Sequence, residues 1–120
     1  MDPQIWNSTT KLNLEYNLGV PVYLKLENLQ VPGSFKIRGI GLTCQIAKEN
    51  GFNRLVGSSG GNAGLAMAYA ANQLKMPITL FIPTSTPEMM VNLIKVSYKS
   101  DNLRTKLWCL KFSKNATKYC

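Results

Sequence analysis

The chain has 120 residues, of which 45% are hydrophobic and 17% charged, and its formal net charge is +8. This length suits one small domain, and the apolar content argues against an unfolded chain. No apolar run approaches the roughly 20 residues of a membrane span, and the first residues lack the basic and apolar regions of a signal peptide. Histidine is absent, so catalysis by a histidine-based triad is excluded.

The positive charge is concentrated at one end of the chain. Residues 1–95 carry eight Lys and Arg against five Asp and Glu, whereas residues 96–120 carry six against one. Such an asymmetry indicates a basic tail rather than a basic domain. The cysteines Cys44, Cys109 and Cys120 form neither a disulfide framework nor a metal-ligand spacing. Their number and scatter favour a reducing compartment.

The first predicted elements are a strand and a helix. Residues 22–26 alternate apolar with polar side chains, which predicts a strand with one polar face. After a turn-rich loop, residues 35–49 predict a helix. Ser34 is expected as the N-cap of this helix, and Gly51 lies just beyond its end.

The same alternation of strand and helix continues through the middle of the chain. Residues 54–57 predict a short strand, and a glycine-rich loop at 58–61 leads into an alanine-rich helix at 62–75. The continuous apolar run 78–82 is of the kind buried in parallel sheets, and residues 87–94 predict another helix. This order predicts an α/β fold with a three-layer open parallel sheet.

The pattern ends in the last part of the chain. The final 33 residues contain neither glycine nor proline, although a folded continuation normally needs turn residues. Trp108, Leu110 and Phe112 resemble one short strand with no connection to the rest. We therefore expect residues 97–120 to be a poorly ordered basic tail.

The first motif that could carry catalytic chemistry is the segment 32–39, which places Lys36 in the first turn of a helix. The positive end of the helix dipole opposes an ammonium there and favours the neutral amine. A neutral amine is what a lysine needs to condense with an aldehyde cofactor, and Phe35 could supply a flat apolar face beside it. The alternative is a solvated lysine on an amphipathic helix, which local chemistry alone favours.

The second motif is the segment 58–64, which follows a strand and opens a helix. Successive backbone N–H groups at such a junction form a cradle for an anion. Gly60 and Gly61 permit close approach of a ligand, and Asn62 offers a neutral polar group. The segment lacks the spacing of a dinucleotide site or a nucleotide P-loop. A tight turn with an N-cap is the alternative interpretation.

The two motifs gain weight as a pair. Each follows a predicted strand, and open parallel sheets bind ligands outside the carboxyl ends of their strands. Lys36 and the loop 58–61 are therefore expected to face one crevice. An amine beside an anion cradle suits an amino-acid substrate condensed with an aldehyde cofactor.

At these motifs the chain resembles a known family. The segments 22–30, 33–39 and 58–64 are similar to the N-terminal part of the pyridoxal-phosphate-dependent serine/threonine dehydratases, the fold-type II enzymes related to tryptophan synthase β. The loop Ser-Ser-Gly-Gly-Asn-Ala-Gly is similar to the L-serine dehydratase/L-threonine deaminase type. The resemblance implies a partial fold-type II domain over residues 1–96, and a cytoplasmic amino-acid catabolic enzyme.

The resemblance also implies roles for individual residues. Lys36 would bind pyridoxal 5′-phosphate covalently and move the Cα proton, and Phe35 would pack on the pyridine ring. Asn62 would hydrogen-bond the 3′-hydroxyl of the cofactor. Four residues would surround the substrate carboxylate: Ser58, Ser59, Gly60 and Ala63. The implied reaction converts L-serine or L-threonine to pyruvate or 2-oxobutyrate and ammonia.

Three departures from the family pattern limit this expectation. The loop reads Val31-Pro32-Gly33 where the family usually has Pro-Ser-Gly, no glycine follows Gly64 where the family has a later phosphate-binding loop, and the similarity ends near Val96. We therefore expect a truncated N-terminal portion that is weakly active or inactive by itself.

Two other hypotheses stay open. The chain could be a non-catalytic fragment or pseudoenzyme that associates with a full-length subunit, or it could form a homodimer as the family often does. A remote alternative is nucleic-acid binding through the basic tail. The partner implied by the resemblance is a small amino-acid substrate, and no membrane is expected.

Overall fold

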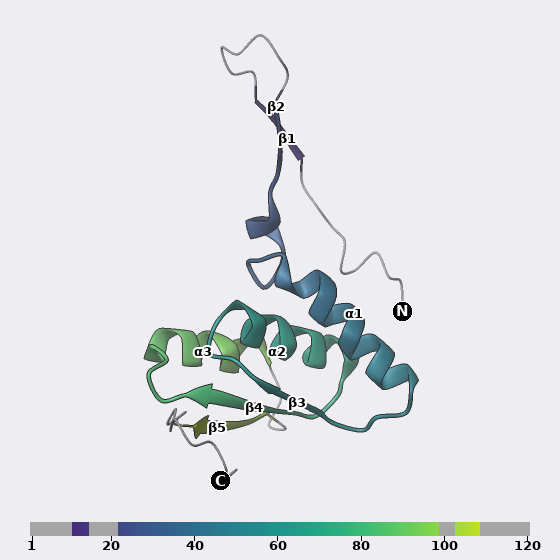
Figure 1. Ribbon diagram of the computed structural model, residues 1–120, viewed down its shortest axis with the longest axis vertical. Coiled ribbons are helices and arrows are strands. Elements are labelled where there is room, and N and C mark those ends of the chain that lie inside the picture. Colours follow the sequence, from purple (N-terminus) through teal and green to yellow (C-terminus); the bar gives the residue numbers. More distant parts are fainter. Residues whose placement is uncertain (1–10, 15–21, 99–102, 109–120) are drawn as a thin grey trace, which may run out of the picture.

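The computed structural model describes residues 11–14, 22–98 and 103–108 (Figure 1). Five strands, one 3-10 helix and three α-helices are found in these ranges. In chain order they are β1 (Lys11–Leu14), β2 (Val22–Lys25), η2 (Glu27–Leu29), α1 (Lys36–Glu49), β3 (Leu55–Ser58), α2 (Asn62–Leu74), β4 (Ile78–Pro83), α3 (Glu88–Ser97) and β5 (Leu103–Trp108).

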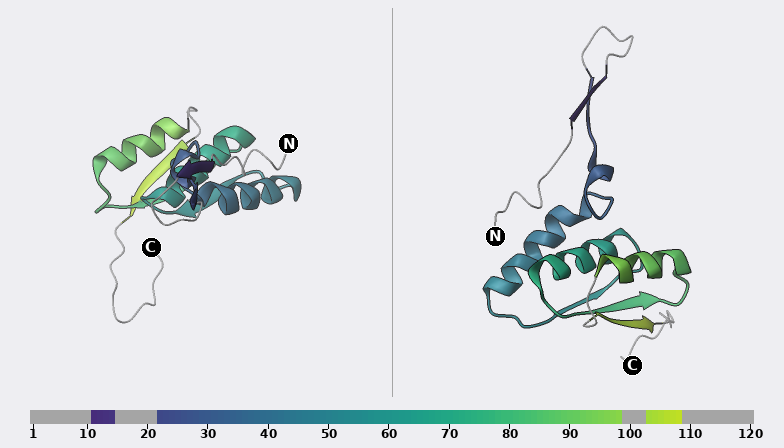
Figure 2. Two further views of the ribbon diagram at one scale, coloured as in Figure 1. Left: turned by 90° about the horizontal axis from the view of Figure 1, so that it is seen from above. Right: turned by 180° about the vertical axis from the view of Figure 1, so that it is seen from behind.

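A parallel sheet carries the main body of the fold, with strand order β3-β4-β5. Leu55 aligns with Ile78, and Ile78 aligns in turn with Leu103. The α/β class with a parallel sheet is thereby confirmed. All three helices lie on one face of this sheet (Figures 1 and 2). The described residues thus build two of the three layers that the sequence predicts.

The strand predicted at 22–26 forms, but not in the parallel sheet. β2 pairs antiparallel with β1, with Leu12 opposite Leu24, and this hairpin projects away from the helices (Figure 1). Strands close in sequence commonly pair with each other, and β1 has the same alternation of polar and apolar residues. The expectation that Lys36 follows a strand of the parallel sheet is therefore wrong.

The two ends of α1 show one correct and one incorrect prediction. At the C-terminal end, Gly51 adopts φ +81°, its N–H donates to Lys48 O, and the Phe52 N–H donates to Ala47 O. This is a Schellman motif, and it confirms Gly51 as the helix stop. At the other end no side chain caps the helix. Ser34 Oγ is buried without a hydrogen-bond partner, so Ser34 is not the N-cap.

The alanines of α2 allow it to pack on two sides. Ala66 and Ala70 belong to a buried cluster with Ile37 and Cys44 of α1. Ala68 and Ala71 belong to a second cluster, which also contains Ile94 of α3, Tyr98 and three side chains of β4: Ile78, Leu80 and Ile82. Small side chains let both α1 and the sheet approach the α2 backbone closely. The helix therefore forms the centre of the fold.

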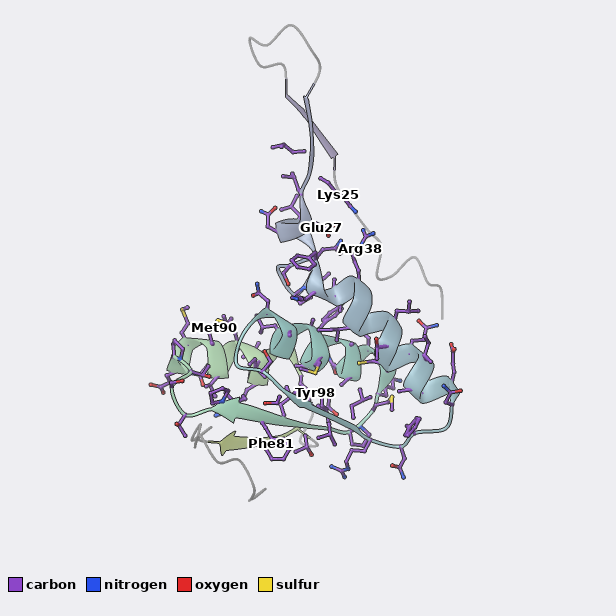
Figure 3. All side chains as sticks on the ribbon, in the orientation of Figure 1. Lys25, Glu27, Arg38, Phe81, Met90 and Tyr98 are labelled. Carbon is purple, nitrogen blue, oxygen red and sulfur yellow. The ribbon has the colours of Figure 1, made fainter. Side chains whose placement is uncertain are left out.

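Ordered structure continues beyond residue 97. The Tyr98 side chain is buried, and its hydroxyl donates to the backbone oxygen of Met76 at 2.8 Å (Figure 3). β5 then adds a parallel strand beside β4, with Trp108 aligned to Pro83. The structure thus describes residue 98 and residues 103–108 of the predicted basic tail, and the expectation that residues 97–120 are poorly ordered stays a prediction. Leu110 and Phe112 lie outside the described residues, and so do Cys109 and Cys120.

No helix in the described part of the chain is long and apolar enough to cross a membrane.

Candidate functional site

An open cavity of about 630 Å³ lies at the N-terminal end of α1. We call it the Lys36 cavity, because the amine of Lys36 lies on its wall. The cavity combines one acidic, two basic, one aromatic and several small or apolar side chains. Its lining residues are Glu27, Phe35, Lys36, Arg38, Gly39, Ile40, Thr43 and Ala63.

Lys36 and Phe35 stand together on the wall of this cavity. Lys36 is the first residue of α1, and its Nζ lies 5.0 Å from the centroid of the Phe35 ring. Phe35 is 57% exposed, so one face of an aromatic side chain is open to a ligand. Ile37, between Lys36 and Arg38, is 2% exposed and anchors this turn in the core. The Phe35 ring thus lies beside the Lys36 amine, and its role toward a cofactor stays a prediction.

Glu27 brings a negative charge to the same cavity. Its Oε1 lies 3.0 Å from Lys25 Nζ and 3.5 Å from the Arg38 guanidinium (Figure 3). Gln30 Nε2 donates to the other carboxylate oxygen at 3.1 Å. The hydrogen bond from Lys25 is the largest influence on this carboxyl group and lowers its pKa, assisted by Gln30 and by the charge of Arg38. Glu27 is therefore a carboxylate at neutral pH.

The loop between β3 and α2 reaches the Lys36 cavity only in part. Ala63 lines the cavity. Ser58, Ser59, Gly60 and Asn62 lie outside its lining, with Ser58 and Asn62 exposed at the surface. The two motifs are thus brought together through Ala63, and the roles predicted for the other four loop residues stay predictions.

Two backbone N–H groups of this loop are used within the fold. The Ser59 N–H donates to Phe81 O at 3.1 Å, and the Gly61 N–H donates to Ser59 Oγ at 3.2 Å. These two donors are therefore not directed at an anion, unlike in the cradle that the sequence predicts. The first hydrogen bond holds the loop against β4, and the second holds the turn of the loop itself.

The glycines of the loop permit contacts within the protein. A Cβ atom on Gly60 would collide with the Thr86 side chain, and one on Gly64 would collide with the backbone oxygen of Ser59 and lie 3.1 Å from Ile94 Cδ1. A Cβ atom on Gly61 would meet nothing within 4 Å. Close packing of the loop thus explains why glycine stands at positions 60 and 64. At Gly61 a side chain would have room.

Cys44 is buried on the inner face of α1, and burial raises the pKa of its thiol to about 11. The side chain is therefore a neutral thiol that packs in the core. It is not a candidate nucleophile.

Sequence reasoning missed several residues of the Lys36 cavity. Glu27 and Arg38 are eleven positions apart, and no local pattern says that a turn will bring them together. Gly39, Ile40 and Thr43 follow Lys36 on α1. The helical spacing of residues 36, 39, 40 and 43 places them on one face, and this signal could have found them.

Comparison with known proteins identifies the family. A family described as "Pyridoxal-phosphate dependent enzyme" matches residues 6–97. This match covers most of the chain, so the chain belongs to the pyridoxal-phosphate-dependent enzyme family. The cofactor of that family is pyridoxal 5′-phosphate.

The relatives include enzymes named for serine and threonine. The chain is 48% identical over 90 residues to a serine dehydratase-like protein of Rattus norvegicus, and the match covers 75% of this chain and 27% of the relative. It is 48% identical over 77 residues to the L-serine dehydratase/L-threonine deaminase of Bos taurus, where the match covers 64% of this chain and 24% of the relative. The chain thus spans about a quarter of the length of these curated relatives.

Solved structures give the same fold. A fungal L-serine ammonia-lyase from Rhizomucor miehei is 30% identical, with a TM-score of 0.69 over 83% of this chain and 32% of that chain. A threonine deaminase from Solanum lycopersicum has a TM-score of 0.69 at 21% identity over 88% of this chain and 30% of that one, a likeness of fold alone.

The Lys36 cavity provides chemical groups that pyridoxal phosphate requires. An aldehyde needs an amine, which Lys36 supplies. A flat aromatic ring needs an apolar face, which the exposed Phe35 offers, and an anionic ligand is favoured near Arg38 and the N-terminal end of α1. The residues present therefore fit the amine and ring portions of the cofactor.

Proposed function

We propose that this chain carries the cofactor-binding lysine segment of a pyridoxal-phosphate-dependent L-serine/L-threonine dehydratase. Lys36 is the residue that holds the cofactor, and the reaction is the dehydration and deamination of a β-hydroxy amino acid. The single observation that carries the proposal is the position of the Lys36 amine against the Phe35 ring in one cavity with Ala63. The names of the similar proteins support the substrate class.

The reaction needs two bonds of the substrate to break. The Cα proton and the Cβ hydroxyl leave as water, and hydrolysis of the resulting enamine gives a 2-oxo acid and ammonia. When bound, the cofactor supplies an electron sink for the pair left at Cα. The Lys36 amine takes the proton at Cα, and Phe35 keeps one face of the ring apolar. The loop residues Ser58, Ser59, Gly60 and Ala63 receive the substrate carboxylate, and Asn62 the cofactor hydroxyl.

The cofactor site is tested by absorption spectroscopy. Pyridoxal phosphate is added to the native chain, to Lys36→Ala and to the control Lys95→Ala, in which an exposed lysine of α3 is removed. We expect a new visible band with the native chain and with the control, and its loss with Lys36→Ala. Identical spectra for the native chain and Lys36→Ala would overturn the role of Lys36.

Turnover is tested separately by measuring pyruvate from L-serine and 2-oxobutyrate from L-threonine. We propose that these 120 residues by themselves are weakly active or inactive, because they span only about a quarter of the length of the curated relatives. Efficient turnover by the isolated chain would refute this part of the proposal.

A second candidate function is association with a longer subunit of the same family. β3 is an edge strand within the described sheet, and its Val56 side chain is 67% exposed. Leu42 and Ile46 of α1 are also about half exposed. Exposed strand edges and apolar patches are features of surfaces that other protein covers. Co-purification with a full-length dehydratase supports this candidate, and a stable monomer in sedimentation counts against it.

A further inference from the structure

The carboxylate of Glu27, on η2, links the end of β2 to α1 on the wall of the Lys36 cavity. Lys25 belongs to the end of β2, Glu27 opens η2, and Arg38 lies in the first turns of α1. One carboxylate oxygen lies within 3.5 Å of both cations, and the other accepts a hydrogen bond from Gln30. Figure 3 marks Lys25, Glu27 and Arg38 at the junction of the hairpin and α1. Glu27 thus joins the chain before the Lys36 motif to the helix after it.

The segment between these two points carries Phe35. It turns through hydrogen bonds from the Leu29 N–H to Leu26 O and from the Gly33 N–H to Gln30 O, with Gly33 at φ +76°. Phe35 and Lys36 are exposed, so the core itself does not hold their side chains. Their orientation depends on the turn that leads into the helix. The contact between Glu27 and Arg38 fixes that turn against α1.

The contact also controls the charges that face the cavity. Lys36 and Arg38 are the two basic residues in its lining, and Glu27 is the acidic one. Arg38 is paired with Glu27 at 3.5 Å. Without that partner, its guanidinium would be free to move beside the Lys36 side chain.

We propose that Glu27 is a positioning residue for the Lys36 cavity. Its carboxylate ties Arg38 to the turn before α1 and thereby fixes the Phe35 ring and the Lys36 amine around a bound aromatic aldehyde. This inference rests on the proposed function of Lys36. It concerns the orientation of the ligand and not the ability of Lys36 to react.

The amount of bound ligand and its orientation are measured separately. The yield of bound pyridoxal phosphate is given by the visible absorption, and its fixed orientation is given by the visible circular dichroism per bound chromophore. A partly exposed ion pair contributes little to overall stability, so removing Glu27 should leave the fold and the yield largely unchanged. We expect most of the visible ellipticity per bound chromophore to be lost.

The experiment uses the full 120-residue chain with pyridoxal phosphate and, in parallel, with pyridoxal. Pyridoxal lacks the phosphate and so removes any direct attraction of Arg38 for that group. The variants are Glu27→Gln, Glu27→Asp and Arg38→Gln. Glu49→Gln is the matched control, because Glu49 lies at the far end of α1 and also accepts a side-chain hydrogen bond, from Gln45.

The two changes at Glu27 distinguish charge from shape. Glutamine has the shape of glutamate without its charge, whereas aspartate keeps the charge on a shorter side chain. We expect Glu27→Asp to retain more ellipticity than Glu27→Gln, and Glu49→Gln to match the native chain. A role in packing alone predicts the opposite order, and that order would overturn the inference. Native ellipticity in Glu27→Gln would overturn it as well.

Folding and the parent proposal are checked in the same experiment. Far-ultraviolet circular dichroism establishes that each variant folds. If Glu27→Gln does not fold, Arg38→Gln replaces it in the test. Failure of the native chain to form a visible band through Lys36 would overturn the proposed function, and this inference with it. A normal native band with unchanged ellipticity in the folded Glu27 or Arg38 variant would overturn this inference alone.

Discussion

At the scale of single residues, charged and aromatic side chains of the candidate site gather around Lys36. The amine, the Phe35 ring and the pair formed by Glu27 and Arg38 line one cavity. The first two were predictable from the sequence, because they are neighbours at the start of a helix. The charge pair was not, because its distance in sequence is bridged by a turn whose shape depends on Gly33 and on buried Gln30.

The Glu27 carboxyl group gives a prediction about pH. Its pKa is lowered from the ordinary value of 4.5, chiefly by the hydrogen bond from Lys25. A carboxyl group whose pKa is lower in the folded state stabilises the fold above its unfolded pKa, and this contribution is lost as the pH falls through the folded pKa. We expect nuclear magnetic resonance titration to place the midpoint of Glu27 below 4.5.

Two variants assign the cause of this lowering. Lys25→Met should raise the pKa of Glu27 more than Arg38→Met does, because the contact with Lys25 is shorter and has the larger influence. An equal or larger effect of Arg38→Met would show that the charge of Arg38 dominates instead.

At the scale of elements, the sequence predicted the two strands and the helix of the β3-α2-β4 unit to within about one residue. Local signals were sufficient there: Gly51 ends α1, and the apolar run 78–82 forms β4. The pairing of β2 with β1 was not predicted, because pairing depends on contacts distant in sequence. For the same reason, Thr86 was not foreseen as the neighbour of Gly60.

Gly64 gives a prediction at this scale. A Cβ atom there would collide with the Ser59 backbone and press on buried Ile94. Overpacking of this kind costs about 1–3 kcal/mol, while the helix preference of alanine offsets about 1 kcal/mol. We therefore expect a net loss of unfolding free energy for Gly64→Ala in urea denaturation.

The matched control for this change is Gly61→Ala. Gly61 has φ −125°, and a Cβ atom there would meet nothing within 4 Å. The unfolding free energy should therefore change by no more than about 0.5 kcal/mol. Equal stability of the two variants would refute the close approach of the loop to α2.

At the scale of the whole molecule, the fold is centred on α2 and closed by residues after the region that the family match covers. The match ends at residue 97, yet Tyr98 belongs to the core cluster and β5 extends the sheet. The sequence indicated one short strand near Trp108 but not its place in the sheet, because the last part of the chain lacks turn residues. Its strand is stabilised by pairing with β4, and local signals do not reveal such pairing.

Tyr98 tests whether this closure contributes to stability. Tyr98→Phe keeps the ring and leaves the backbone oxygen of Met76 without its donor, at a cost of about 1–2 kcal/mol. Val96→Ala is the control, because Val96 is 67% exposed and its loss should change stability by about 0.5 kcal/mol or less. Thermal unfolding measures both, and a neutral Tyr98→Phe would contradict a stabilising role of the hydrogen bond from Tyr98 to Met76.

The proposed role of Lys36 as the lysine that holds pyridoxal phosphate can be tested chemically. The mixture of chain and cofactor is reduced with borohydride, and the labelled lysine is located by peptide mass spectrometry. Other described lysines, including Lys48, Lys75 and Lys95, serve as internal controls. We expect Lys36 to carry most of the pyridoxyl label at low cofactor concentration. Label spread evenly over the lysines, or concentrated on another one, would contradict it.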